Sequence, residues 1–354
     1  MSIYSAMTVH IQGLVGDIAL LLEPTNTVER QMTYKKMCTL LTGFLGAFTI
    51  FATHAAPSYP NKPVRLIVPW PAGGSADTLG RSLGEVLGQK LDTPVIIENV
   101  AGASGTIGTQ QMVRAAPDGY TLLLATSSAN VSAPNLYKSV NFDPIKDFSP
   151  IGAVALIPSI LIVPNDSKYG SARDIVAGAK RDPGVLSYGS GGIGNSGHLS
   201  AELFLSATDT QATHIPYKGN NPALVDLIGG RLDFMFDNGA VDNIKTGRIK
   251  GLAVASENRI KTLPEVPTFK ELGMPGVELS TWFGLAAPAA TPDAIIKKVN
   301  TALNEALEDP SLAKRLIDMG ADIQPGTAQE FSAFWASEFG RYKELIRISG
   351  AAQE

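Results

Sequence analysis

A short glycine-containing stretch near residue 70 has the residue types of an anion-binding loop. The residues Val64-Arg65-Leu66-Ile67-Val68, apolar except for the arginine, are followed by Pro69-Trp70-Pro71-Ala72-Gly73-Gly74-Ser75-Ala76-Asp77. This order predicts a buried strand, a tight turn and the first turn of a helix. Backbone N–H groups and the positive end of the helix dipole then point at one place, which favours a carboxylate or another anion. We therefore expect Ala72, Gly73, Gly74 and Ser75 to bind an anion, with Trp70 as a wall.

Three further loops rich in small hydrogen-bonding residues follow predicted strands, at residues 126–130, 189–198 and 217–221. Ligands of open α/β sheets bind at the carboxyl ends of the strands, so four such loops together favour one polar cleft. Beyond the first loop, the residues that we expect in this cleft are Ser127, Asn130, Ser190, Gly191, Asn195, His198, Tyr217, Lys218 and Asp237. Each residue type is also common in ordinary turns, caps and solvated surfaces.

Two enzyme interpretations compete with simple binding. Ser190 or Ser196 beside His198 would suit a secreted serine hydrolase, although no G-x-S-x-G motif is present. Gly189, Gly191 and Gly194 match G-x-G-x-x-G, but the next predicted strand ends in Tyr217-Lys218 and not in the acid that would bind a ribose. We therefore expect no nicotinamide or other cofactor.

Residues 1–55 are typical of an over-extended start followed by a signal peptide. Lys35 and Lys36 precede the apolar residues 37–51, and small residues lead to a cleavage site after Ala55. Met32 is the more plausible initiator. The only cysteine, Cys38, lies in this segment, so the mature chain has no thiolate metal ligand. With two scattered histidines, His198 and His214, no metal site is expected. Export through this signal predicts a periplasmic protein.

Charge and composition exclude other classes of protein. The chain has 29 Lys and Arg against 33 Asp and Glu, a formal net charge of −4. Residues 1–55 contain Arg30, Lys35 and Lys36 against Asp17, Glu23 and Glu29, so the remainder keeps this charge. It lacks the basic patch that nucleic acid requires. With 44% hydrophobic residues, the chain has enough apolar side chains for a folded core.

Predicted strands and helices alternate along the chain. The predicted strands are residues 65–68, 95–98, 121–125, 152–163, 185–188, 212–216, 232–236, 251–255 and 282–286. Leu79, Leu83, Val86 and Leu87 share one helical face, and Thr327 to Glu330 form a capping box before an aromatic C-terminal helix. This alternation indicates an α/β fold with a largely parallel sheet.

Two long apolar runs, residues 152–163 and 280–288, are placed to cross between two lobes. They predict a discontinuous domain I of residues 56–158 and 278–354, with domain II, residues 159–277, inserted in it. A ligand cleft is then expected between the two lobes.

Five motifs in this order resemble the Bug family, the solute-binding receptors of tripartite tricarboxylate transporters. They are the residue 69–77 motif, Glu98-Asn99-Val100-Ala101-Gly102-Ala103-Ser104-Gly105, Pro117-Asp118-Gly119-Tyr120-Thr121-Leu122, Pro216-Tyr217-Lys218-Gly219 and Leu263-Pro264-Glu265-Val266-Pro267-Thr268-Phe269. The similarity runs from about Tyr59 to the C-terminus. The family often has Arg-Pro-Gly-Ala-Gly where this chain has residues 100–104, and the third loop is unusually rich in glycine.

The resemblance implies a type II-like, two-lobed periplasmic binding protein. Each lobe would hold a mixed, mainly parallel sheet flanked by helices. Residues 72–75 and 190–195 would hold one carboxylate, and Ser127, Asn130, Tyr217 and Asp237 would lie near the distal end of the ligand. The implied protein is not an enzyme. It captures a small organic carboxylate for the membrane subunits of a tripartite transporter, or serves as a sensor that presents its closed form to a membrane partner.

Overall fold

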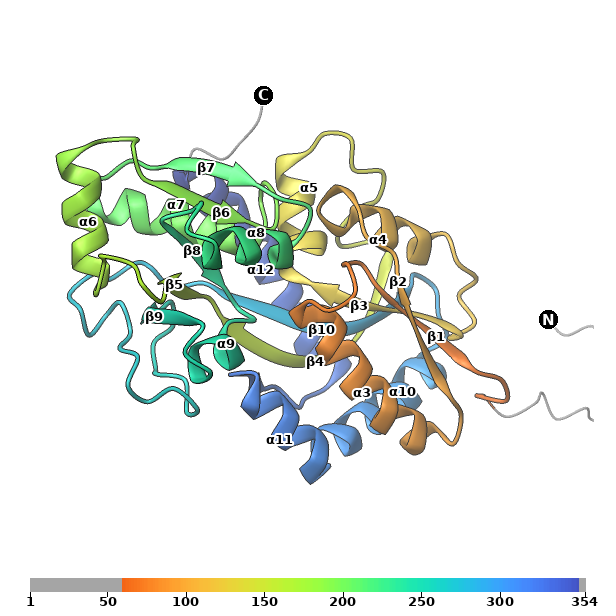
Figure 1. Cartoon of the computed structure of the whole chain (residues 1–354). Coiled ribbons are helices and arrows are strands. Elements are labelled where there is room, and N and C mark those ends of the chain that lie inside the picture. Colours follow the sequence, from red (N-terminus) through yellow and green to blue (C-terminus); the bar gives the residue numbers. More distant parts are fainter. Residues whose placement is uncertain (1–58, 350–354) are drawn as a thin grey trace, which may run out of the picture. The chain divides into compact units, whose positions relative to one another are not determined.

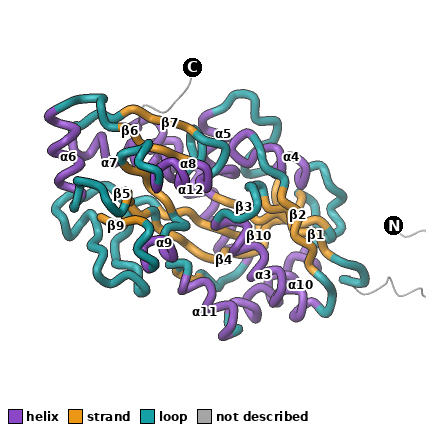
Figure 2. Tube along the Cα trace, in the orientation of Figure 1, coloured by secondary structure: helices purple, strands orange, loops and turns teal. Residues whose placement is uncertain are grey.

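Two mixed β-sheets organise residues Tyr59–Ser349, which are the residues that this computed structural model describes (Figures 1 and 2). The strands of the first sheet are β1 (Val64–Val68), β2 (Val95–Asn99), β3 (Thr121–Thr126), β4 (Phe148–Pro158), β10 (Ser280–Pro288) and β11 (Asp322–Ile323), in the spatial order β11-β4-β10-β3-β1-β2. The strands of the second are β5 (Ile160–Pro164), β6 (Ser187–Ser190), β7 (Thr213–Pro216), β8 (Phe234–Asp237) and β9 (Ile249–Val254), in the order β7-β6-β8-β5-β9.

Each sheet is parallel on one side and antiparallel on the other. Strand β1 pairs in parallel with β2 and β3, and β6 pairs in parallel with β7 and β8. The long strands β4 and β10 are antiparallel to each other, as β5 is to β8 and β9. The predicted α/β fold is confirmed, but antiparallel pairing takes a larger share than the sequence predicted. An apolar run marks a strand buried on both faces without giving its direction.

Helices cover both faces of the first sheet. They are α3 (Ser75–Leu91), α10 (Asp293–Leu307) and α11 (Pro310–Asp318) on one face, and α4 (Thr106–Val113), α5 (Ala133–Leu136) and α12 (Ala328–Ser349) on the other. The predicted face of α3 is confirmed, because Leu79, Leu83, Val86 and Leu87 are buried in the first of these cores. The capping box of α12 is confirmed too: the Glu330 N–H donates to Thr327 Oγ1 over 3.1 Å.

The second sheet is covered in the same way. Helices α6 (Ala172–Arg181) and α7 (Ser196–Thr208) contribute to one core, and α8 (Asn220–Ile228) and α9 (Val241–Lys245) contribute to the other. Helix α7 contacts both sheets, since Phe204 packs in the core of the second sheet while Leu199 and Leu203 pack against residues of the first. The loop before α7 is thereby held close to both sheets.

The chain passes from the first sheet to the second at Ser159, between β4 and β5. The single apolar run expected at residues 152–163 is therefore two strands in two sheets. The Ser159 N–H donates to the Leu279 carbonyl (3.3 Å), the Leu279 N–H to Ala255 (3.0 Å) and the Ala255 N–H to Ser159 (2.8 Å), which ties the crossing segments together. The domain limits at residues 158/159 and 277/278 remain a prediction.

The predicted signal peptide and start, residues 1–55, lie outside the described residues. Among the helices of Tyr59–Ser349, none combines the length and the apolar character that crossing a bilayer requires.

Candidate functional site

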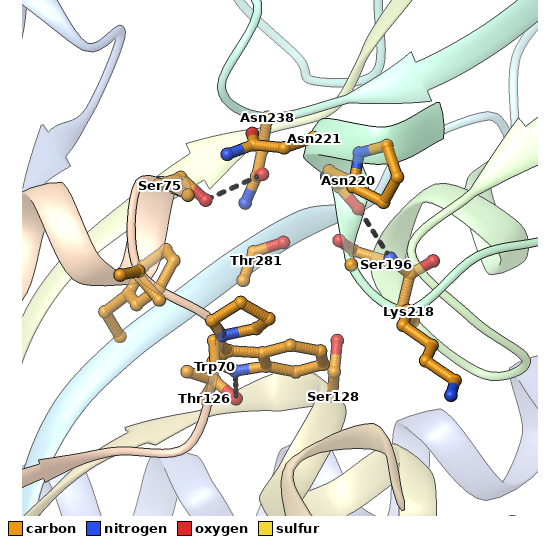
Figure 3. Close-up of a pocket in the computed structure, with 18 residues that line it drawn as sticks. Trp70, Ser75, Thr126, Ser128, Ser196, Lys218, Asn220, Asn221, Asn238 and Thr281 are labelled. Carbon is orange, nitrogen blue, oxygen red and sulfur yellow. Dashed lines mark hydrogen bonds between the residues drawn. The ribbon is translucent and has the colours of Figure 1, made fainter. Parts of the chain in front are cut away.

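The carboxyl ends of the parallel strands from both sheets border one cavity of about 260 Å³ (Figure 3). Loops after β1, β3, β6, β7 and β8 supply its walls, and the start of β10 lies between them. Its polar side chains include Ser75, Ser128, Asn195, Ser196, Asn220 and Asn238, and Trp70 and Phe283 supply apolar surface. This is the edge at which an open α/β sheet binds its ligands.

Within the described residues, helices α3, α7 and α8 all begin at this cavity, at Ser75, Ser196 and Asn220. The N-caps of α3 and α8 are Gly74 and Gly219, which provide no side-chain cap. The first N–H groups of a helix have no partner within the helix, and its N-terminus carries partial positive charge. The cavity therefore receives backbone donors and a positive potential from more than one direction.

Thr281 supplies a hydroxyl that has no protein partner. The side chain is 4% exposed, and no described residue makes a hydrogen bond with Oγ1. Figure 3 shows Thr281 in the middle of the ring of labelled side chains. A buried hydroxyl without a partner costs free energy, and a polar ligand would remove that cost.

The polar side chains connect the two sheets across the cavity. Ser75 Oγ, at the start of α3, donates to Asn238 Oδ1, after β8, over 3.1 Å. On another wall, Asn195 Nδ2 donates to Asn220 Oδ1 over 2.9 Å. Trp70 is fixed by its indole N–H, which donates to Thr126 Oγ1 over 3.2 Å. All three of these contacts join neutral groups.

Fixed charge is scarce at the cavity. Among the described residues that line it, Lys218 has the one charged side chain, which is exposed and extends away from the other labelled side chains (Figure 3). Asp77 lies behind the first loop, where its carboxylate accepts from the Gly73 N–H over 2.8 Å. Burial opposes its ionisation, but Arg81, the Gly73 N–H and Asn99 together hold the pKa of Asp77 below its usual range. A ligand would meet mainly neutral donors.

Six of the fourteen residues expected from the sequence line the cavity: Trp70, Ala72, Gly74, Ser75, Asn195 and Lys218. Two more shape the loops through their backbone. Gly73 has φ +83°, and a Cβ on Gly191 would lie 2.2 Å from Asn220 Oδ1. Glycine at these two positions permits the turn and the close approach of the loop to Asn220.

The other six lie outside the lining. Ser127 and Asn130 are buried in the turn after β3, where Asn130 Oδ1 accepts from the Thr126 N–H over 2.9 Å. Tyr217 points its hydroxyl at Asp226, to which it donates over 2.7 Å. Asp237 does not border the cavity; its Oδ1 accepts from Nδ2 of Asn220, which does, over 2.5 Å. Burial raises the pKa of Asp237.

Ser190 and His198 belong to a buried group that we call the histidine cluster: Tyr188, Ser190, His198, Glu202 and His214. The two imidazole rings stack with their centroids 4.1 Å apart, and His214 stacks on Tyr188 at 4.8 Å. Ser190 Oγ lies 2.7 Å from His214 Nε2, and the Gly194 N–H donates to His198 Nδ1 over 3.1 Å. Tyr188 donates its hydroxyl to Glu202.

Both imidazoles of the histidine cluster are neutral at neutral pH, and Ser190 is fully buried. Burial lowers the pKa of His198 to about 3, with a contribution from His214, and lowers the pKa of His214 to about 4. Ser190 has no exposed surface and contacts His214, whereas the hydrolase interpretation paired it with His198. Ser196 lines the cavity, but His198 Nδ1 faces Gly194. Neither serine forms the expected pair with His198.

Several lining residues were not anticipated as site residues. Asn220 and Asn221 lie in the fourth loop, so their carboxamides could have been named with Tyr217 and Lys218. Ser128 and Asn238 are next to expected residues, one position along the chain. Thr281 sits within an apolar strand, and no sequence signal separated it from core residues. Over Tyr59–Ser349, no group of three or more His, Cys, Asp or Glu side chains could hold a metal ion.

Comparison with known proteins agrees with this geometry. Residues 79–350 match the sequence model of the tripartite tricarboxylate transporter family receptor. The periplasmic binding protein BugD is 34% identical, with a TM-score of 0.79 over 84% of this chain and 100% of BugD. Rpa4515 of R. palustris, solved with adipate, is 32% identical, with a TM-score of 0.80 over 82% of this chain and 98% of its own.

A third solved structure, MatC from Rhodopseudomonas palustris with bound malate, is 29% identical, with a TM-score of 0.76 over 81% of this chain and 100% of its own. The family match covers most of the chain, and the two-sheet fold and the cleft-edge loops agree with it. This chain belongs to the tripartite tricarboxylate transporter receptor family, the Bug family of periplasmic solute-binding proteins, and is a binding protein rather than an enzyme.

Proposed function

We propose that the protein captures a small dicarboxylate, in the size range of malate and adipate, in the cavity between its two sheets. The observation that carries this proposal is that three helix N-termini and the buried, unpartnered Thr281 hydroxyl border the same cavity. Helix N-termini favour anions, and the 260 Å³ cavity suits a small ligand. The adipate and malate bound by two relatives support this ligand class.

Reversible capture is consistent with neutral donors. A hydrogen bond to a charged group contributes about 1.5–3 kcal/mol, so a few such bonds, less the cost of association, correspond to roughly micromolar affinity. A buried arginine pair would hold the carboxylate more tightly and slow its release. We propose that the two lobes close on the ligand and that the closed form is recognised by the membrane subunits of a tripartite transporter in the periplasm, after export through the signal at residues 1–55.

The experiment is a thermal-shift screen of residues 56–354 against small mono-, di- and tricarboxylic acids, followed by calorimetry on each compound that raises the melting temperature. We expect a stabilised complex with four- to six-carbon dicarboxylates and none with the matched diamides. If amines or neutral sugars stabilise the protein and no carboxylate does, the proposal is refuted.

A further inference from the structure

One wall of the cavity is built on a continuous chain of hydrogen bonds, which we call the amide chain. It begins at the His198 N–H, which donates to Asn195 Oδ1 over 2.9 Å. Asn195 Nδ2 donates to Asn220 Oδ1 over 2.9 Å, and Asn220 Nδ2 donates to Asp237 Oδ1 over 2.5 Å. Asn195 and Asn220 line the cavity, and Asp237 lies behind them, 4% exposed.

The groups at the two ends of the amide chain require the same orientation of its two carboxamides, with each oxygen towards the His198 end. The His198 N–H can only donate, so it requires the oxygen of Asn195. Asp237 Oδ1 also accepts from the Gly239 N–H over 3.2 Å, so it is an acceptor and requires the NH₂ group of Asn220. Each carboxamide therefore has its oxygen occupied by a protein donor. Each oxygen keeps a second lone pair but is held towards a protein donor, whereas each NH₂ group keeps one hydrogen without a partner among the described residues.

The facing Ser75–Asn238 pair has no such constraint. Ser75 Oγ donates to Asn238 Oδ1, but a hydroxyl both donates and accepts. Asn238 can turn its NH₂ group towards Ser75 Oγ and keep a hydrogen bond. This side of the cavity can therefore offer a ligand either a donor or an acceptor.

We propose that the amide chain makes its wall donor-only, so that this wall requires an ionised carboxylate, whereas the Ser75–Asn238 side accepts either a carboxylate or a carboxamide. The proposal rests on the dicarboxylate function proposed above. Asn195 and Asn220 are then the recognition residues. Asp237 is a positioning residue that acts through Asn220. The sequence analysis expected Asp237 to contact the ligand directly, and this indirect role takes the place of that contact.

Two substitutions test whether the orientation is fixed from both ends. Asn195→Ser keeps a side chain that can cap α7 but is too short to reach Asn220. Asp237→Asn keeps the size of the side chain while offering Asn220 either an oxygen or an NH₂ group. Each single variant leaves one end intact, so Asn220 should keep its orientation. Only the double variant frees the Asn220 carboxamide to turn its oxygen to the cavity.

The readout is the ratio of dissociation constants for adipamide and adipate, measured by calorimetry for the four proteins. We expect wild type to favour adipate by about a hundredfold or more and Asp237→Asn to stay within about threefold of that ratio. Asn195→Ser removes one of the two donors and should lose up to about tenfold of the ratio, and the double variant should lose at least about tenfold more than Asn195→Ser. A double variant with the same ratio as Asn195→Ser, or a ratio already lost in Asp237→Asn, overturns the proposal.

A measurement without ligand separates this proposal from the proposed function. In the NMR spectrum of the free protein, the side-chain NH₂ protons of Asn195 and Asn220 should exchange with solvent more slowly than those of the exposed Asn258, and the double variant should remove this protection at Asn220. Equal exchange at Asn220 and Asn258 in wild type overturns the amide chain. Protected amides in a protein that binds no carboxylate overturn the dicarboxylate function instead.

Discussion

The histidine cluster and the cavity both contact the loop of residues 191–195. They differ in whether their polar atoms have hydrogen-bond partners within the protein. In the histidine cluster, Ser190, His198 and Tyr188 each have a protein partner at hydrogen-bonding distance. In the cavity, Thr281 Oγ1 has none, and the first N–H groups of α3 and α8 are not capped by a side chain. The histidine cluster has the residue types of an active site, whereas the cavity has the free hydrogen-bonding capacity.

The difference shows that a ligand site depends more on polar groups that have no protein partner than on the types of residue present. A serine next to a histidine attracts attention in a sequence, but here the pair is buried and satisfied. Buried polar groups are normally hydrogen-bonded, so an unpartnered one that also lines a cavity, as Thr281 does, is the stronger indication of a ligand.

The largest effect is expected from Gly74→Val, at the N-cap of α3. Gly74 has φ −85°, and a Cβ would meet no atom closer than 3.8 Å, so the variant should fold. The valine side chain would cover the end of α3 and should weaken dicarboxylate binding by about a hundredfold or more, as loss of several charge-assisted hydrogen bonds would. Calorimetry measures the affinity and thermal melting reports the fold.

The matched control is Gly340→Val on α12, where a Cβ has open space around it. It should leave affinity unchanged. Normal binding by Gly74→Val would show that the start of α3 is not part of the site.

Thr281→Val should change affinity and stability in opposite directions. Valine keeps the shape of the side chain and removes a buried hydroxyl that has no partner. The free protein should become more stable by about 1 kcal/mol, while the ligand should bind about tenfold more weakly. Chemical denaturation without ligand and calorimetry with ligand measure the two effects. A stability loss would mean that the hydroxyl has a role in the free protein.

Ser190→Ala, in the histidine cluster, should have the opposite pattern to Thr281→Val: a loss of stability with little change in affinity. It removes a hydroxyl 2.7 Å from His214 Nε2 and leaves a half-buried histidine without this partner. We expect a loss of about 1–2 kcal/mol in the free energy of unfolding and less than about a threefold change in affinity. If affinity falls and stability does not, Ser190 contacts the ligand after all.

The sequence predicted the loops and helices that surround this site better than the individual side chains that line it. The turn at Gly73 and Gly74 was recognisable because glycine, a preceding strand and a following helix lie next to one another in the chain. Leu79, Leu83, Val86 and Leu87 predicted the buried face of α3 for the same reason. Local signals of this kind depend on short-range geometry and need no knowledge of the tertiary fold.

Contacts between distant segments were not predictable in this way. The parallel register of β6 and β7 places Tyr188 opposite His214, which brings His214 to Ser190 and occupies it. Asn238 reaches Ser75 across 163 positions of the chain. Thr281 lies in a buried strand, and whether its hydroxyl has a partner and borders a cavity is a property of the folded chain.

The histidine cluster also differs from the cavity in its contribution to the pH dependence of protein stability. Because burial lowers the pKa of His198 to about 3, the unfolded chain, with an imidazole pKa of about 6.5, binds more protons between these values. Stability contributed by His198 is therefore complete above about pH 6.5 and is lost as the pH falls towards 3. Burial raises the pKa of Glu202, which acts in the opposite direction.

His198→Asn should flatten this dependence, because the Asn oxygen can still accept from the Gly194 N–H but does not titrate. Between pH 6.5 and pH 4 the slope of unfolding free energy against pH should fall by up to about 1 kcal/mol per pH unit. Chemical denaturation at several pH values measures it. Parallel curves for wild type and variant would place the titrating group elsewhere, and affinity at neutral pH should be unaffected.

The smallest effect is expected from Lys218→Gln, the removal of the charged side chain at the cavity rim. Lys218 is exposed and extends away from the labelled side chains, so water and salt screen its charge from a bound anion (Figure 3). Affinity should fall by less than about threefold at physiological ionic strength, with a slightly larger fall at low salt. Calorimetry at two salt concentrations measures both. A loss of tenfold or more that persists at high salt would mean that closure brings the ammonium onto the ligand, and the cavity would then depend on a fixed charge instead of on its unpartnered neutral donors.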